Sequence, residues 1–193
     1  GGYALALITL SLVPLAGYSG QISLAQMSFA GIGAVVMGNV GANNPVLGLV
    51  AAVAVAAVVG ALVSLPALRL SGIYLALLTA SFALMLSKLV LSQQKVMPQG
   101  NLAVPALSDA WNTATARIIV SAVAFTLVGI VVVAVRRSGF GRRLVAMKDS
   151  PAACATLGLN LTKTNLSVFA LSAGIAGLGG ALLAGSVRVD QFS

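Results

Sequence analysis

The chain has 193 residues, of which 59% are hydrophobic and only 7% are charged, and its net charge is +8. About 25% of the residues of a soluble domain are charged, so water is not the main solvent of this chain. The single cysteine, Cys154, excludes an internal disulfide and a zinc site built from several thiolates.

The first 68 residues contain no charged side chain, which is more apolar chain than one helix needs to cross about 30 Å of hydrocarbon. Turn-forming residues cluster at 17–21 and 41–45, where Pro45 also disfavours a helical residue before it. We therefore expect spans at 3–16, 24–40 and 46–68. The first is short, since its helix would reach only about 21 Å, so it is either cut short or half of a broken helix.

Three further spans follow. Residues 73–91 form a fourth apolar run, and a loop at 92–116 contains Trp111, which we expect at the water interface. Residues 118–135 form a fifth run between Arg117 and Arg136, and residues 166–187 form the sixth. The fold class is thus all-α, a polytopic membrane protein with about six spans in one domain covering 1–193. The absence of an initiator Met leads us to expect a fragment.

Small residues recur at four-residue spacing in two of these spans. The sixth span carries Ala173, Gly177, Ala181 and Gly185, and the second carries Ala30, Ala34 and Gly38. Such stripes let another helix approach closely, so we expect helix packing there rather than ligand contacts.

Six basic residues gather between the fifth and sixth spans: Arg136, Arg137, Arg142, Arg143, Lys148 and Lys163. Loops rich in Lys and Arg remain cytoplasmic and face anionic lipid, so segment 136–164 is expected inside. A nucleic-acid surface would need basic residues on an exposed face with stacking or polar neighbours, whereas these flank membrane-length spans. We expect no nucleic-acid partner.

The chain lacks the groups that most membrane chemistry requires. It has no Glu, no His and three Asp residues outside the spans, which argues against proton coupling and against an embedded hydrolase. It also lacks the Gly-rich phosphate loop that binds ATP. We expect no enzyme activity, no metal and no cofactor on this chain. Active transport would draw energy from another subunit, while a passive channel or structural subunit remains an alternative.

Residues 149–158 predict a short helix of about two turns. Ser150 suits the N-cap, Pro151 the first helical position and Gly158 the left-handed residue after the end. A helix this short and poor in large apolar residues would not be stable alone, so we expect it to dock against a partner. Cys154 is interpreted as a small filler in it.

Three motifs in order resemble the branched-chain amino-acid ABC transporter permease family. They are the segment Gly17 to Gln26 with Phe29 to Ala34, then Leu68 to Ala76, and then Asp149 to Asn160 with the Gly-rich run Ser172 to Ala184. The last resembles the cytoplasmic coupling loop of the family, which receives the ATPase. Two departures are that Ser150-Pro151 precede the paired alanines, where an acid is common, and that the chain stops soon after Val187.

The resemblance implies an inner-membrane subunit of a bacterial importer of branched-chain or related apolar amino acids. It implies cytoplasmic ATP-binding subunits, a second related permease and an extracytoplasmic substrate-binding protein, with ATP held by the partner. Relatives also carry urea and amides, so the solute stays open. The coupling residues that it implies are Asp149, Ser150, Pro151, Ala152, Ala153 and Gly158.

Two breaks, the first at 17–21 and the second at 71–74, are candidates for the substrate pathway. Broken helices offer free backbone N–H groups and a positive dipole end to a carboxylate. The candidate residues are Gly17, Tyr18, Gly20, Gln21, Gly72 and Tyr74. The alternative is that both breaks are turns at the membrane surface.

Overall fold

The computed structural model describes residues 2–21, 23–41, 44–67, 70, 72–88 and 114–186. All regular structure in these residues is helical, which confirms the all-α prediction. The elements are α1 (Gly2–Leu10), the π-helix η1 (Val13–Tyr18), α2 (Gln26–Val40), α3 (Pro45–Ala67), α4 (Ile73–Leu86), α5 (Ala114–Arg137), α6 (Gly139–Asp149), α7 (Pro151–Thr156) and α8 (Leu161–Ser186). Each predicted span contains one apolar helical segment, and α3, α5 and α8 are long enough to cross a membrane.

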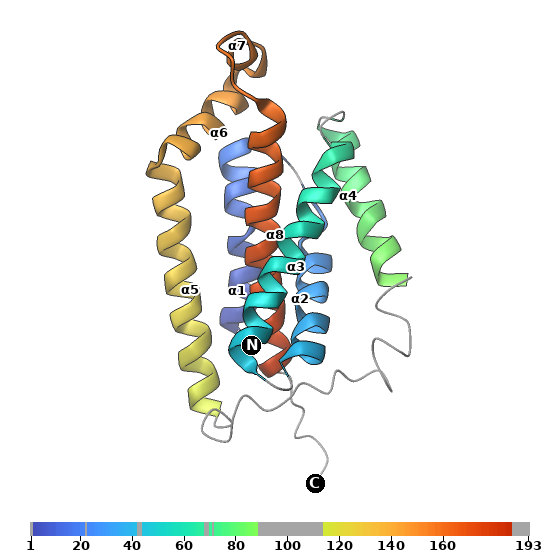
Figure 1. Ribbon diagram of the computed structural model, residues 1–193, viewed down its shortest axis with the longest axis vertical. Coiled ribbons are helices and arrows are strands. Elements are labelled where there is room, and N and C mark those ends of the chain that lie inside the picture. Colours follow the sequence, from blue (N-terminus) through green and yellow to red (C-terminus); the bar gives the residue numbers. More distant parts are fainter. Residues whose placement is uncertain are drawn as a thin grey trace.

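The long helices alternate in direction (Figure 1). The path through α1 and η1 runs toward the end that carries α6 and α7, α2 returns, α3 and α5 run toward that end, and α4 and α8 run away from it (Figure 1). The turn after η1, the connection between α3 and α4, and segment 136–164 therefore share one end of the bundle. We call it the α6–α7 end. This is the arrangement that alternation of the six predicted spans requires.

The first helix continues further than the sequence indicated. Pro14 has no N–H to donate, and the chain widens there into η1, which continues to Tyr18. Gly20 then adopts a left-handed φ of 70°, and the N–H of Gln21 donates to the carbonyl of Leu15 at 3.1 Å. Gly17 and Tyr18 are therefore helical, and the break that we predicted at 17–21 begins only after Ser19.

Helix α8 is the centre of the bundle. In its most apolar stretch 61% of the residues are buried, against 6% in α5, because α1, α2 and α3 all pack around α8. A Cβ added at Gly180 would overlap the backbone of Ala30 in α2, and one at Gly177 would overlap Ala56 in α3. Ala173 and Ala181 are buried. These small residues let three backbones approach closely.

The packing face of α2 differs from the predicted stripe. Ala30, Gly33 and Met37 are buried, whereas Ala34 and Gly38 are only partly buried. A spacing of four residues drifts by about 40° at each step from a 3.6-residue turn, so it leaves the contact face within two steps. Gly33 instead lies against the backbone of Gly177.

Segment 136–164 is not an extended loop. It consists of the end of α5, all of α6 and α7, and the first turn of α8, which starts five residues earlier than expected and includes Lys163. The other end of α5 likewise begins before the predicted span, at Ala114. The end of the predicted fourth span and the loop after it, residues 89–113 including Trp111, fall outside the described residues. Gly185 lies in the last turn of α8.

Candidate functional site

Helix α6 follows α5 at the α6–α7 end and is amphipathic. Ser138 is its N-cap and its hydroxyl accepts from the N–H of Gly141 at 3.3 Å. Gly141, Leu144 and Met147 are buried on one face, while Arg142 and Arg143 are exposed. The helix thus lies across the bundle with its basic side outward.

Helix α7 has the ends that its sequence predicts. Ser150 is the N-cap with its hydroxyl accepting from Ala153 N–H, Pro151 occupies the first turn, and Gly158 adopts a left-handed φ of 78°. The prediction of this helix is confirmed. Cys154 alone among residues 151–158 is buried, and it is the contact of α7 with the bundle. Leu157 is 82% exposed at the C-terminal end of the helix.

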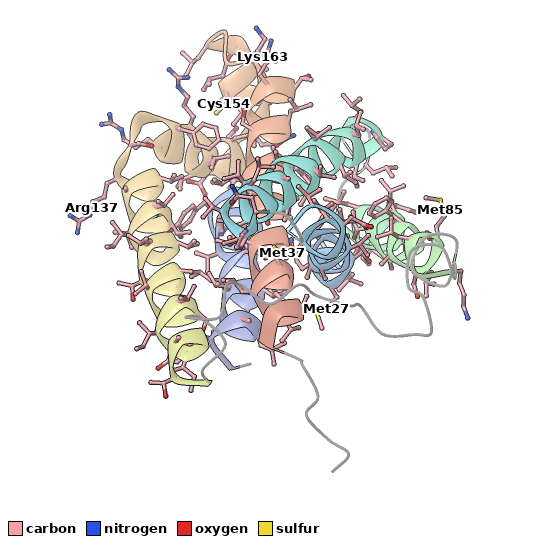
Figure 2. The ribbon with its side chains drawn as sticks, turned by 60° about the horizontal axis from the view of Figure 1, so that its bottom comes forward. Met27, Met37, Met85, Arg137, Cys154 and Lys163 are labelled. Atoms are coloured by element: carbon pink, nitrogen blue, oxygen red, sulfur yellow. The ribbon has the colours of Figure 1, made fainter. Side chains whose placement is uncertain are left out.

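One hydrophobic cluster lies directly beneath α7. It joins Cys154 of α7 to Leu144 and Met147 of α6, Leu15 of η1, Leu75 of α4, and Val168 and Phe169 of α8. Figure 2 shows Cys154 and Lys163 together at this end of the ribbon, while Met37 lies deep in the bundle. Helix α7 therefore shares one hydrophobic cluster with η1, the helix that ends at the first break.

A cavity of about 610 Å³ opens beside this cluster at the α6–α7 end. Five segments of the chain line it, and the lining residues are Ser19, Gly20, Gln21, Leu70, Gly72, Leu75, Met147, Lys148, Pro151, Leu161, Thr162 and Asn165. It unites three of the predicted pathway residues, Gly20, Gln21 and Gly72, with Pro151 of the predicted coupling helix. We call it the junction cavity.

Lys148 crosses the first break at one side of this cavity. Its ammonium donates to the carbonyl of Gly17 at 3.4 Å. The aliphatic stem of Lys148 packs against Gly20. A Cβ at Gly20 would lie 2.9 Å from Cγ of Lys148, so any larger residue there would displace the lysine. The left-handed φ of Gly20 favours glycine for a second reason.

Gln21 makes the other contact across the cavity. Its side-chain Nε2 donates to Oδ1 of Asn165 at 2.7 Å, which joins residues 144 positions apart in the sequence. Asn165 lies in the second turn of α8, so this bond connects the first break to the helix at the centre of the bundle.

Two predicted pathway residues lie away from the cavity. The hydroxyl of Tyr18 donates to the carbonyl of Val132 in α5 at 3.3 Å, and the guanidinium of Arg136 lies 5.5 Å from the centre of its ring. Tyr74 is 69% exposed on α4 and does not line the cavity. Of the predicted coupling residues, Asp149, Ser150, Ala152, Ala153 and Gly158 are all exposed at the same end.

A polar cluster below the junction cavity ties the start of α2 to two neighbours. Gln26 Oε1 lies 2.9 Å from the hydroxyl oxygen of Ser11, and Gln26 Nε2 donates to Ser172 Oγ at 3.1 Å. The hydroxyl of Ser172 donates to the backbone carbonyl of Ser11. All three side chains are buried, so the polar groups near the break are satisfied without water.

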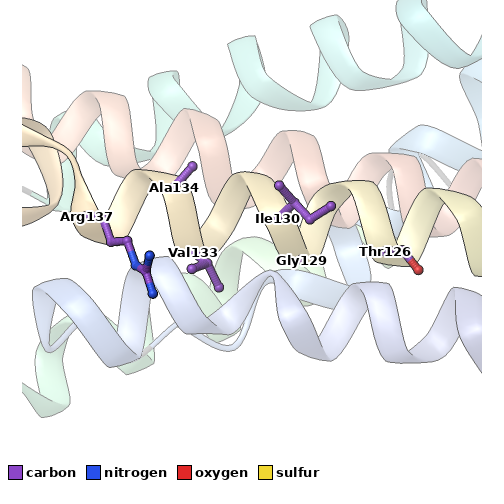
Figure 3. Close-up of a pocket in the computed structure, with 6 residues that line it drawn as sticks. All are labelled: Thr126, Gly129, Ile130, Val133, Ala134 and Arg137. Carbon is purple, nitrogen blue, oxygen red and sulfur yellow. The ribbon is translucent and has the colours of Figure 1, made fainter.

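A second hollow, of about 520 Å³, runs along α5 (Figure 3). All the described residues that line it belong to α5: Thr126, Gly129, Ile130, Val133, Ala134 and Arg137. A space bounded by a single helix is an indentation of its outer face, and it brings together no groups from different elements.

Asn165 was not among the residues predicted from the sequence, and Lys148 was not expected at the first break. An amphipathic pattern at Phe140, Leu144 and Met147 would have indicated α6 and put the next residue, Lys148, beside its buried face. Asn165 had no such signal, because its role depends on a contact with Gln21 across the fold.

Residues 2–193 match the family described as the permease component of branched-chain amino acid transport systems. The chain belongs to this family. The permease is accordingly a polytopic, multi-pass membrane protein of a transport family rather than of an enzyme family. No curated protein and no solved structure matches it.

Proposed function

We propose that this permease is the translocating subunit of an ATP-driven importer that carries branched-chain or related small apolar amino acids across the bacterial inner membrane. ATP is bound and hydrolysed by a separate cytoplasmic subunit, and the permease itself holds no cofactor. A second, related permease and an extracytoplasmic binding protein complete the complex. The family match over residues 2–193 supports this proposal.

The form of α7 supports docking of the ATP-binding subunit. A six-residue helix that touches the bundle through Cys154 leaves its remaining surface available to a partner. Leu157 adds a large apolar side chain that is 82% exposed. Burying it against a partner would contribute about 1.5–3 kcal/mol to the interface.

Capture of the cytoplasmic ATPase tests the docking role. We expect the wild-type permease to recover the ATPase and a Pro151→Ala, Gly158→Val variant to lose it, because valine strains the left-handed residue that ends α7 and alanine no longer fixes φ at its start. Leu157→Ser leaves those ends intact and should also reduce recovery. Lys163→Met is the matched control, since Lys163 is exposed at the same end but lies in α8. Equal recovery with all variants would exclude docking through α7.

Uptake by the reconstituted complex separates active import from a passive channel, the alternative that the sequence left open. A variant of the partner ATPase that binds but does not hydrolyse ATP should abolish uptake of leucine, isoleucine and valine. Uptake that continued down the concentration gradient would show a channel. Parallel assays with urea and short amides would identify a permease of the same type with another solute.

A further inference from the structure

The junction cavity has a positive and hydrogen-bond-donating lining. Among the described residues, Lys148 is the one charged member of the lining, and Asp149, the only acid among them, is not part of it. An ammonium has three N–H donors, and within the described part of the chain that of Lys148 has one acceptor, the carbonyl of Gly17 at 3.4 Å. At least two donors are free to face a ligand.

Amide and hydroxyl groups extend this donor set. Asn165 uses its Oδ1 as acceptor for Gln21, which leaves its NH₂ group free to donate. The hydroxyl of Thr162 is exposed in the same lining. Lysine, asparagine and threonine donors converging without a carboxylate are the chemistry that binds an anion.

The lining also contains large apolar side chains. They are those of Leu70, Leu75, Met147 and Leu161. A volume of about 610 Å³ falls within the range of about 300–1,000 Å³ that is typical of small-molecule sites. A ligand with an anionic group at one end and an apolar body at the other would match both the donor groups and the apolar side chains of the lining.

We propose that the junction cavity binds a small amphipathic anion, a carboxylate or phosphate joined to an apolar group, with the anionic group on Lys148 and Asn165. If the proposed function holds, the carboxylate is that of the transported amino acid as it leaves on the cytoplasmic side. The head group of an anionic lipid offers the same chemistry. Gly20 positions Lys148 for either, because the lysine stem rests on it.

The junction cavity adjoins α7, so a ligand bound in the cavity can affect this helix. Pro151 lines the cavity, and Met147 belongs both to its wall and to the hydrophobic cluster beneath Cys154. A ligand held there touches the helix that we assign to ATPase docking. Occupation of the cavity by the carried amino acid would therefore feed back on the transport cycle from the cytoplasmic side.

The test uses the whole transporter complex in lipid nanodiscs and a diazirine analogue of leucine that labels its surroundings on illumination. We expect label in peptides containing Met147 and Leu161, competed by leucine but not by leucinamide, which lacks the carboxylate. Lys148→Met should reduce labelling about tenfold or more, because a hydrogen bond to a charged group contributes about 1.5–3 kcal/mol. Lys148→Arg should retain it, and Lys163→Met, which removes an exposed charge outside the cavity, should leave it unchanged.

Native mass spectrometry distinguishes the two sources of the anion. Phosphatidylglycerol retained by the wild type but lost from Lys148→Met in native mass spectrometry would support the site with a lipid as its occupant. Competition by leucinamide equal to that by leucine, with no Lys148-dependent lipid, would overturn the proposal, as would an equal loss in Lys163→Met. ATPase capture is measured on the same samples. Capture without Lys148-dependent binding rejects only this inference, whereas binding without capture rejects only the docking role.

Discussion

Gln26 illustrates how a buried polar side chain is made tolerable in a membrane helix bundle. Its amide lies between two hydroxyl groups, that of Ser11 just after α1 and that of Ser172 in α8. The two hydroxyl groups also contact backbone carbonyls, of Ile8 and Ser11 respectively. The serines therefore keep partners without the glutamine, whereas the glutamine depends on the serines.

That asymmetry makes a prediction. Ser11→Ala combined with Ser172→Ala strands the Gln26 amide, at a cost of about 2 kcal/mol, and should lower the melting temperature by about 4–8 °C. Adding Gln26→Leu removes the amide that has lost its partners and should recover most of the lost melting temperature. Reaction of the single buried thiol, Cys154, with a fluorogenic maleimide on heating reports unfolding. Ser167→Ala, an exposed serine bonded within α8, is the control. A triple variant as unstable as the double would contradict this account.

At the scale of elements, the sequence predicted helices far better than the contacts between them. The ends of α7 follow from Ser150, Pro151 and Gly158, since caps are encoded locally. The burial of Gly33 in place of Ala34 depends on the neighbouring helix α8, which periodicity alone does not specify. The proximity of Gly20, Gln21 and Gly72 in the junction cavity likewise arises from the return of three helices to one end of the bundle.

The glycines of α8 allow a prediction on helix packing. A Cβ at Gly180 would overlap the carbonyl of Ala30, so Gly180→Ala must separate α2 from α8 and should destabilise the permease by about 1–3 kcal/mol. Gly174→Ala is the matched control in the same helix, because its Cβ would lie 3.4 Å from the nearest atom, an ordinary contact. Alanine is also the better helix former there by up to about 1 kcal/mol. The same thermal assay checks both, and an equal loss in the two variants would show that α2 and α8 do not meet as described.

At the scale of the whole molecule, the described residues are asymmetric in charge. Figure 2 shows Arg137 projecting away from the helices and Lys163 at the α6–α7 end. The four arginines of 136–143 and Lys148 lie in the same part of the chain, between the end of α5 and the end of α6. Each basic residue near an anionic cytoplasmic leaflet contributes about 1 kcal/mol of attraction, so together they favour one orientation strongly.

Topology is therefore the prediction on which docking, the junction cavity and import all depend. In a Cys154→Ala background the chain has no other cysteine, so single cysteines at Ala146 in α6 and at Asn44 before α3 report opposite ends of the bundle from exposed positions. A membrane-impermeant maleimide should label Asn44→Cys in intact cells and Ala146→Cys only after the membrane is permeabilised. Neither substitution alters a charged residue, so the orientation signal itself is preserved. Labelling of Ala146→Cys from outside would place α7 away from any cytoplasmic ATPase, and the proposed function would fall with it.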